Sequence, residues 1–396
     1  MNTHPAPNSL VFLLIPMVLF SALAMDIYVP AVPALPALLK TNADLVQLTL
    51  SCFIFGIGVG QVIAGPLSDS FGRRCVGLMS LSIFVLASWG CALSQNIAQL
   101  IIARLVEALG ACGCTVVALA MVRDAFPEKN QPKIYSYLAG SISVAPILGP
   151  IIGGYLLLWF TNWRVMFLFL GLFGFIMLLL QYRYLPETNK KQHRIPFQLN
   201  FLKQYLVCLK SPRFLSYAFC AATAMSALFL FFSISSLLLI SHLDVLPHHF
   251  GYYFAVNAIA FMLTCFAGTF LENYLQPRSV VVIGQLLMLV GAAAMIMWHI
   301  VAGLSIAAVV LPMVVITMGV ALILGPSTAL ALKAYGDLAG TASALFGCIE
   351  FIIPAFMGGI MVNDDISSTL PLAIPLILLS SLSLIALGLF TDEDKV

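Results

Sequence analysis

Charged side chains are scarce in this sequence: Asp, Glu, Lys and Arg together make up 9% of its 396 residues. A soluble domain carries about 25% charged residues because its surface must face water. Hydrophobic residues instead make up 61% of the chain, and the mean hydropathy is +1.05. This composition excludes an ordinary soluble protein and indicates a surface that faces lipid.

Several chemical motifs are also missing. No G-x-x-x-x-G-K-[ST] loop is present, so ATP is not expected to drive the protein. The six histidines include no i, i+4 pair, since His248 and His249 are adjacent. The nine cysteines form no C-x-x-C and are expected to be packing residues. We therefore expect no enzyme, no sensor, no metal, no cofactor and no nucleic-acid partner.

Long apolar runs recur from one end of the chain to the other. A membrane-spanning helix needs about 20 apolar residues. The N-terminus has neither a basic start nor a small-residue cleavage site, so the first run is expected to stay and span. The sequence predicts an all-α integral membrane protein with twelve transmembrane helices, over 10–38, 45–67, 75–94, 97–121, 135–158, 163–185, 213–241, 249–271, 278–299, 302–333, 340–362 and 370–390.

Basic residues predict the orientation and the domains. With both termini in the cytoplasm, all 18 Lys and Arg fall on the cytoplasmic side except Lys40 and Arg164 outside and Arg104 within a span. A polar stretch at 186–212 carries several of them and divides the chain. We therefore expect two six-helix bundles, 1–185 and 213–396, joined by a cytoplasmic linker in a bacterial inner membrane, with a substrate path between the bundles.

Ionisable groups inside a bilayer are costly and are by default functional. Asp26 lies in the first span beside Tyr28, and prolines follow at 30, 33 and 36. Each proline removes a backbone donor, and the carbonyls freed in this way would line a polar cavity with Asp26 and Tyr28. The alternative is a kinked helix end at which Asp26 is solvated.

Arg104 and Glu107 lie three residues apart on one helix face. Desolvation disfavours an ionised carboxylate and a neighbouring cation favours it, and such a balance suits a group that binds and releases protons. The alternative is a static ion pair. Glu350, near the middle of the eleventh span, has no opposite charge in its run. It is expected to be protonated for much of the transport cycle or to meet a cationic substrate. The alternative is a neutral Glu that is hydrogen-bonded to a neighbouring helix.

Two further motifs stand out in the first half of the chain. One is a short turn after the second span, and the other is a small-residue stretch of the fifth span that predicts close packing and a bend. The turn contains Gly65, Asp69, Gly72, Arg73 and Arg74, and the small-residue stretch contains Pro146, Gly149, Pro150, Gly153 and Gly154.

Together these stretches resemble the major facilitator superfamily. The turn is similar to that family's signature G-x-L-x-D-x-x-G-R-R/K, which implies a role in the conformational switch. The run around Arg104 is similar to a motif whose arginine is tied to proton coupling, and Gly149-Pro150-x-x-Gly153-Gly154 is similar to the antiporter motif. The resemblance implies the major facilitator fold, with proton coupling through Asp26, Arg104 and Glu107.

Three stretches, 26–33, 121–124 and 340–344, resemble the branch of drug:proton antiporters that confers bicyclomycin and chloramphenicol resistance. That branch commonly has glutamine where this chain has Glu107 and Glu350. The resemblance implies a monomer, surrounded by membrane lipid, that exports small organic compounds in exchange for protons. Asp26, Tyr28, Glu107 and Glu350 are the candidate substrate-binding residues. A dedicated carrier for one metabolite or siderophore, in either direction, is the alternative.

Overall fold

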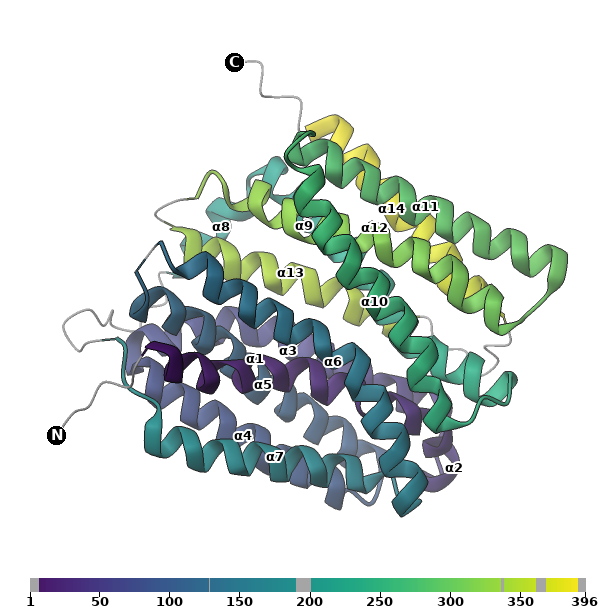
Figure 1. Cartoon of the computed structure of the whole chain (residues 1–396), viewed down its shortest axis with the longest axis horizontal. Coiled ribbons are helices and arrows are strands. Elements are labelled where there is room, and N and C mark those ends of the chain that lie inside the picture. Colours follow the sequence, from purple (N-terminus) through teal and green to yellow (C-terminus); the bar gives the residue numbers. More distant parts are fainter. Residues whose placement is uncertain (1–6, 128, 190–200, 336–337, 361–367, 391–396) are drawn as a thin grey trace.

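The computed structural model describes residues 7–127, 129–189, 201–335, 338–360 and 368–390, and it is helical throughout its length (Figure 1). The helices, in chain order, are α1 (Pro7–Asp26), the 3₁₀ segment η1 (Val29–Ala34), α2 (Leu35–Leu39), α3 (Ala43–Phe71), α4 (Arg73–Leu93), α5 (Ile97–Ala125), α6 (Gln131–Phe160), α7 (Arg164–Tyr184), α8 (Phe201–Leu209), α9 (Pro212–Ser236), the π-helical segment η3 (Leu237–His242), α10 (Pro247–Leu271), α11 (Pro277–Ala302), α12 (Ile306–Leu332), α13 (Ala339–Ile360) and α14 (Leu370–Phe390).

Twelve stretches of the described chain are long and apolar enough to cross a membrane, which confirms the predicted number. The first combines α1, η1 and α2, and the seventh combines α9 and η3. A helix satisfies its backbone hydrogen bonds internally, so it is the form an apolar chain takes in lipid. The tenth span begins at Ile306, later than predicted, because Ser305 caps it and accepts a hydrogen bond from the Ala308 N–H.

The same capping chemistry sets other boundaries. The Asn42 side chain accepts from the Leu45 N–H at the start of α3, and Asn96 accepts from the Gln99 N–H at the start of α5. Ser211 does the same for Phe214 in α9. Each cap satisfies a backbone donor that has no partner within its helix. Polar residues between apolar runs therefore mark where these spans begin.

The buried apolar side chains form two large clusters. One consists of residues between 10 and 185 together with Phe229 and Ala355, and the other consists of residues between 205 and 387 together with Val29. In Figure 1 the purple to blue-green helices α1–α7 accordingly lie together, beside the green to yellow helices α9–α14. The predicted bounds of the bundles and linker stay a prediction, and 190–200 of that linker lies outside the described residues.

Close helix contacts join the two groups of helices along α3 with α13 and along α6 with α10. A Cβ at Gly58 of α3 would lie 2.9 Å from Ile352 Cγ1 of α13. A Cβ at Gly251 of α10 would lie 2.8 Å from the Ile151 nitrogen of α6. Glycine permits both approaches, because any larger residue would force the helices apart.

Candidate functional site

The centre of the candidate site is an ion pair between Arg104 and Glu107 on α5. Arg104 Nη1 lies 2.6 Å from Glu107 Oε2, and both side chains are fully buried. The same Nη1 donates to the Ala24 carbonyl of α1 at 3.1 Å. The i, i+3 spacing predicted this pairing. The hydrogen bond to Ala24 also brings Arg104 to the end of α1, two residues before Asp26.

Helix α4 completes the environment of Glu107. The Ser88 hydroxyl donates to Glu107 Oε1 at 2.7 Å, and the Cys91 thiol lies 3.8 Å from Oε2. The Arg104 guanidinium stacks 4.0 Å from the centre of the Phe53 ring of α3. Aromatic faces attract a cation electrostatically, and this stacking compensates Arg104 where hydrogen bonds do not. The pair is enclosed by α1, α3 and α4, so Glu107 is closed off from solvent in this conformation, and its substrate-binding role stays a prediction.

Asp26 is the last residue of α1 and is 1% exposed. Its Oδ2 has no hydrogen-bond partner among the described residues. This burial excludes the alternative of a solvated helix end. The prolines act as predicted on the backbone: α1 stops at Asp26, and the chain continues as the short 3₁₀ segment η1, which contains Pro30 and Pro33.

Tyr28, between α1 and η1, is fully buried and does not line an open cavity in this conformation. Its hydroxyl lies 3.1 Å from Thr49 Oγ1 of α3, and the Thr49 hydroxyl donates to the Val46 carbonyl at 2.6 Å. The Tyr28 ring also lies 5.1 Å from the Arg104 guanidinium. Tyr28 therefore joins α1 and α3 and covers one side of the ion pair.

The small residues of α6 pack against this end of α1. A Cβ at Gly149 would lie 2.5 Å from Asp26 Cβ, and a Cβ at Gly153 would collide with the Ile27 carbonyl oxygen. A Cβ at Gly154 would meet the Pro247 carbonyl of α10 at 2.6 Å. The predicted close packing is present, and Pro146 and Pro150 lie within one uninterrupted helix. The sequence did not indicate that the motif contacts Asp26.

Glu350 lies on α13, apart from the ion pair. Its side chain is half-buried, and no described residue forms a hydrogen bond or ion pair with its carboxylate. The structure therefore does not join Glu350 to Asp26, Arg104 or Glu107. Nor does it provide the neutral hydrogen bond to a neighbouring helix that was the alternative for this residue.

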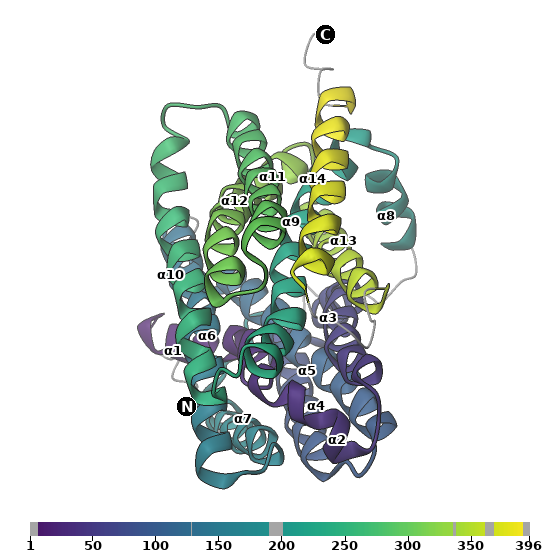
Figure 2. The same cartoon turned by 90° about the vertical axis from the view of Figure 1, so that its right-hand side faces the viewer.

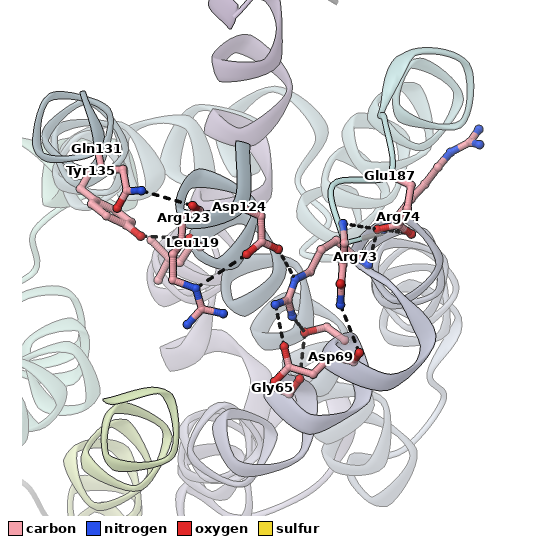
Figure 3. Close-up of polar contacts among 12 residues, drawn as sticks. Gly65, Asp69, Arg73, Arg74, Leu119, Arg123, Asp124, Gln131, Tyr135 and Glu187 are labelled. Atoms are coloured by element: carbon pink, nitrogen blue, oxygen red, sulfur yellow. Dashed lines mark hydrogen bonds and ion pairs between the residues drawn. The ribbon is translucent and has the colours of Figure 1, made fainter. Parts of the chain in front are cut away.

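A second polar cluster lies where α3 meets α4 (Figure 3). Arg73 Nη2 lies 2.6 Å from Asp69 Oδ1, and Arg73 Nε lies 2.8 Å from Asp124 Oδ2 at the end of α5. The sequence predicted a turn over 65–74, but α3 continues to Phe71 and α4 begins at Arg73. Gly72 alone breaks the helix, with φ +97°, which glycine adopts without a steric penalty.

Sequence reasoning missed Glu187, which follows α7 and covers this junction (Figure 3). Its Oε1 accepts from the Arg73 N–H at 2.9 Å and its Oε2 from the Arg74 N–H at 3.3 Å. These are the first N–H groups of α4, and a carboxylate there is favourable. The Asn189 amide donates to the Asp69 carbonyl at 3.1 Å. An acid directly after a span and opposite the basic turn was the available sequence signal.

Comparison with known proteins places these features in a family. The model of the Major Facilitator Superfamily matches residues 14–359. A chloramphenicol resistance protein of Pseudomonas aeruginosa is 33% identical over 355 residues, which cover 89% of this chain and 83% of that protein. A bicyclomycin resistance protein homolog of Haemophilus influenzae is 28% identical over 360 residues, which cover 88% and 87%.

Solved structures support the same fold. The crystal structure of a D-xylose–proton symporter aligns with a TM-score of 0.76 at 14% identity, covering 98% of both chains. An inward-facing, occupied bacterial homolog of the human lysosomal transporter Spinster aligns with a TM-score of 0.74 at 16% identity, covering 98% of this chain and 97% of that one. The twelve apolar spans of the described chain agree with the family match, which covers most of the sequence. The chain therefore belongs to the Major Facilitator Superfamily, and it is a secondary membrane transporter of small molecules and not an enzyme.

Proposed function

We propose that this transporter exports small organic compounds from the bacterial cytoplasm in exchange for protons. The similarity to a chloramphenicol resistance protein and to a bicyclomycin resistance homolog supports export of drug-like compounds. The bias of Lys and Arg supports an inner-membrane orientation with both termini cytoplasmic. The protein acts as a monomer in which the bundles 1–185 and 213–396, joined by the linker 186–212, alternately expose one site.

Asp26 is the proposed proton carrier, and its unpartnered buried oxygen is the observation that carries the proposal. An unpaired carboxylate ion is costly in a low-dielectric interior, whereas a protonated acid is neutral. With Glu107 already neutralising Arg104, a proton on Asp26 leaves the whole site uncharged. In this conformation Asp26 therefore holds the proton.

Proton release requires that Asp26 gain a cationic partner or contact with water. Arg104 is the candidate partner, because it already donates to the Ala24 carbonyl of the same helix end. When Arg104 turns from Glu107 toward Asp26, Glu107 takes up a proton or moves into the substrate path. The two acids share one arginine, and this sharing couples protonation to the position of α1 against α5.

The substrate site lies between the bundles, and Glu350 contributes to it from α13. A half-buried carboxylate with no described partner favours substrates that carry a positive charge. Asp26 and Tyr28 reach the same path only after α1 and α6 move, because both are closed off from solvent here. The cluster of Asp69, Arg73 and Asp124 would hold one state of this movement.

Export can be tested in cells that express the protein. We expect higher resistance to a panel of cationic and neutral drugs and faster efflux of a cationic dye. A protonophore, which dissipates the proton gradient, should remove the dye efflux. Asp26→Asn should abolish both effects, whereas Glu272→Gln, an exposed acid outside the site, should not. Unchanged susceptibility across the panel, with normal expression, would favour a dedicated metabolite carrier instead.

A further inference from the structure

The helix α8 (Phe201–Leu209) lies beside the bundle, outside α13 and α14 (Figure 2). Polar contacts fix it there: the Tyr205 hydroxyl donates to the Val62 carbonyl of α3 at 3.3 Å, and the Thr341 hydroxyl donates to Gln204 at 2.9 Å. Its other face is apolar and exposed, at 56% for Leu206 and 55% for Val207. A docked helix with an exposed apolar face at the end of several spans is suited to the plane of the membrane interface.

The end of α8 leads directly into a groove between α9, α13 and α14. The groove has a volume of about 510 Å³, and its lining includes Lys210, Leu215, Phe219, Ile353, Ala386 and Phe390. Among the described lining residues, the one polar side chain besides Lys210 is that of Ser216, whose hydroxyl is already used in a hydrogen bond to the Pro212 carbonyl at 2.8 Å. The groove therefore offers carbon surface along its length and one cation.

That cation lies at the mouth of the groove. Pro212 is the first residue of α9 and Phe390 the last of α14, so their end of the groove is at a membrane face. The groove reaches inward as far as Ile353, which lies thirteen residues beyond Gly340 near the start of α13, or about 20 Å along the helix. Lys210 is exposed and forms no ion pair with another described residue. A positive group at the interface and an apolar slot that extends inward match an anionic head group and an acyl chain.

We propose that this groove binds an anionic phospholipid of the leaflet on the linker side. One acyl chain lies between α9, α13 and α14, and the phosphate lies at Lys210, beside the interfacial helix α8. Ile349 and Ile353 line the groove, and they flank Glu350 on the same helix. Bound lipid therefore packs against the helix that carries Glu350. The proposal does not depend on proton coupling or on the identity of the exported compound.

Native mass spectrometry of the full chain tests this directly. The protein is released from micelles that contain equimolar phosphatidylglycerol and phosphatidylcholine, and lipid adducts are counted for the wild type and four variants. Lys210→Gln removes the cation, and Leu215→Trp fills the groove from its rim. The matched controls are Lys333→Gln, an exposed lysine at the end of α12, and Leu286→Trp, an exposed leucine of α11.

We expect one retained phosphatidylglycerol on the wild type. Lys210→Gln should lower its affinity by about five-fold, the effect of one basic residue at an anionic membrane surface. Leu215→Trp should remove the adduct, and both controls should keep it. Equal retention of phosphatidylcholine, equal losses in Lys210→Gln and Lys333→Gln, or a lipid-free dimer that covers the groove would each overturn the proposal.

Discussion

At the scale of single residues, Arg104 is a charged group buried within a span, and its charge needs compensation from its neighbours. Arg104 is fully buried and always charged, and it is compensated by Glu107, the Ala24 carbonyl and the Phe53 ring. Breaking a buried pair leaves one charge without compensation, whereas replacing both partners by apolar groups is often neutral. The contribution of the pair can therefore be measured separately from that of packing.

We expect Arg104→Leu to destabilise the protein by about 3–5 kcal/mol, because Glu107 is left buried without its cation. The double variant Arg104→Leu/Glu107→Leu should recover most of this loss, while both variants should be inactive in transport. Thermal unfolding of the purified proteins measures the difference. If the double variant were as unstable as the single one, packing and not charge would explain the burial of this pair.

Glu187 makes a second prediction at this scale. Glu187→Ala removes two charge-assisted hydrogen bonds from the first N–H groups of α4. Each such bond contributes about 1.5–3 kcal/mol. Hydrogen exchange at the amides of Arg73 and Arg74 should therefore be at least about ten-fold faster, with partial loss of transport. Glu272→Ala, at an exposed turn, serves as the control. Unchanged exchange at both amides would argue against Glu187 as a cap.

At the scale of helices, α6 lies against both groups of helices. Its Gly149 and Gly153 pack against residues 26 and 27 in one bundle, and Gly154 packs against α10 in the other. The motif thus positions the backbone at Asp26 and at the same time contacts the opposite half. Any change of the angle between α6 and α1 alters the surroundings of the Asp26 carboxyl.

Gly153→Ala should separate α6 from α1, because the added Cβ would collide with a backbone carbonyl that cannot move aside. We expect a lower melting temperature and loss of transport. Gly140→Ala on the same helix is the matched control, since a Cβ added there would have no atom within 4 Å. This control should be neutral or stabilising by up to about 1 kcal/mol. Equal melting temperatures and equal transport in the two variants would mean that close packing at Gly153 is not required.

Local sequence patterns were sufficient for the number of spans and for a contact within one helix, but not for the helix junction at Gly72. Hydropathy predicted the twelve spans, and i, i+3 spacing predicted the Arg104–Glu107 pair. Contacts between distant segments could not be predicted in this way. Ser88 binds Glu107 from another helix, and Glu187 lies 114 residues from Arg73 in the chain. The enclosure of Tyr28 and Glu107 likewise follows from how α1, α3, α4 and α5 pack together.

At the scale of the whole molecule, polar contacts join α3 to α9 and α6 to α10 near one end of these helices. The Gln47 amide of α3 donates to the Ser233 carbonyl of α9 at 2.7 Å, and the Ser233 hydroxyl donates back to Gln47. Nearby, η1 contacts α9 and α10. The Tyr155 and Tyr252 hydroxyls, 2.8 Å apart, join α6 to α10. The distribution of basic residues predicts that these contacts lie at the outer end of the spans.

Gln47→Ala should shift the protein toward the conformation that is open at this end. Two hydrogen bonds contribute about 2 kcal/mol together, which corresponds to roughly a 30-fold change in the ratio of the two states. Distances between spin labels at Thr161 and Asp244 report the populations. Gln99→Ala, at an exposed position of α5, should leave the distribution unchanged. The same distribution in Gln47→Ala would mean that this contact does not hold the closed state.

Substrate-induced proton release reports directly on whether Asp26 exchanges a proton for substrate. Purified wild-type protein in weakly buffered detergent solution should release protons when a transported drug is added. Asp26→Asn should abolish this release, Glu107→Gln should change its pH dependence, and Glu350→Gln should weaken substrate binding while leaving release at saturation. Proton release of wild-type size in all three variants would rule out these carboxylates as the exchanging groups.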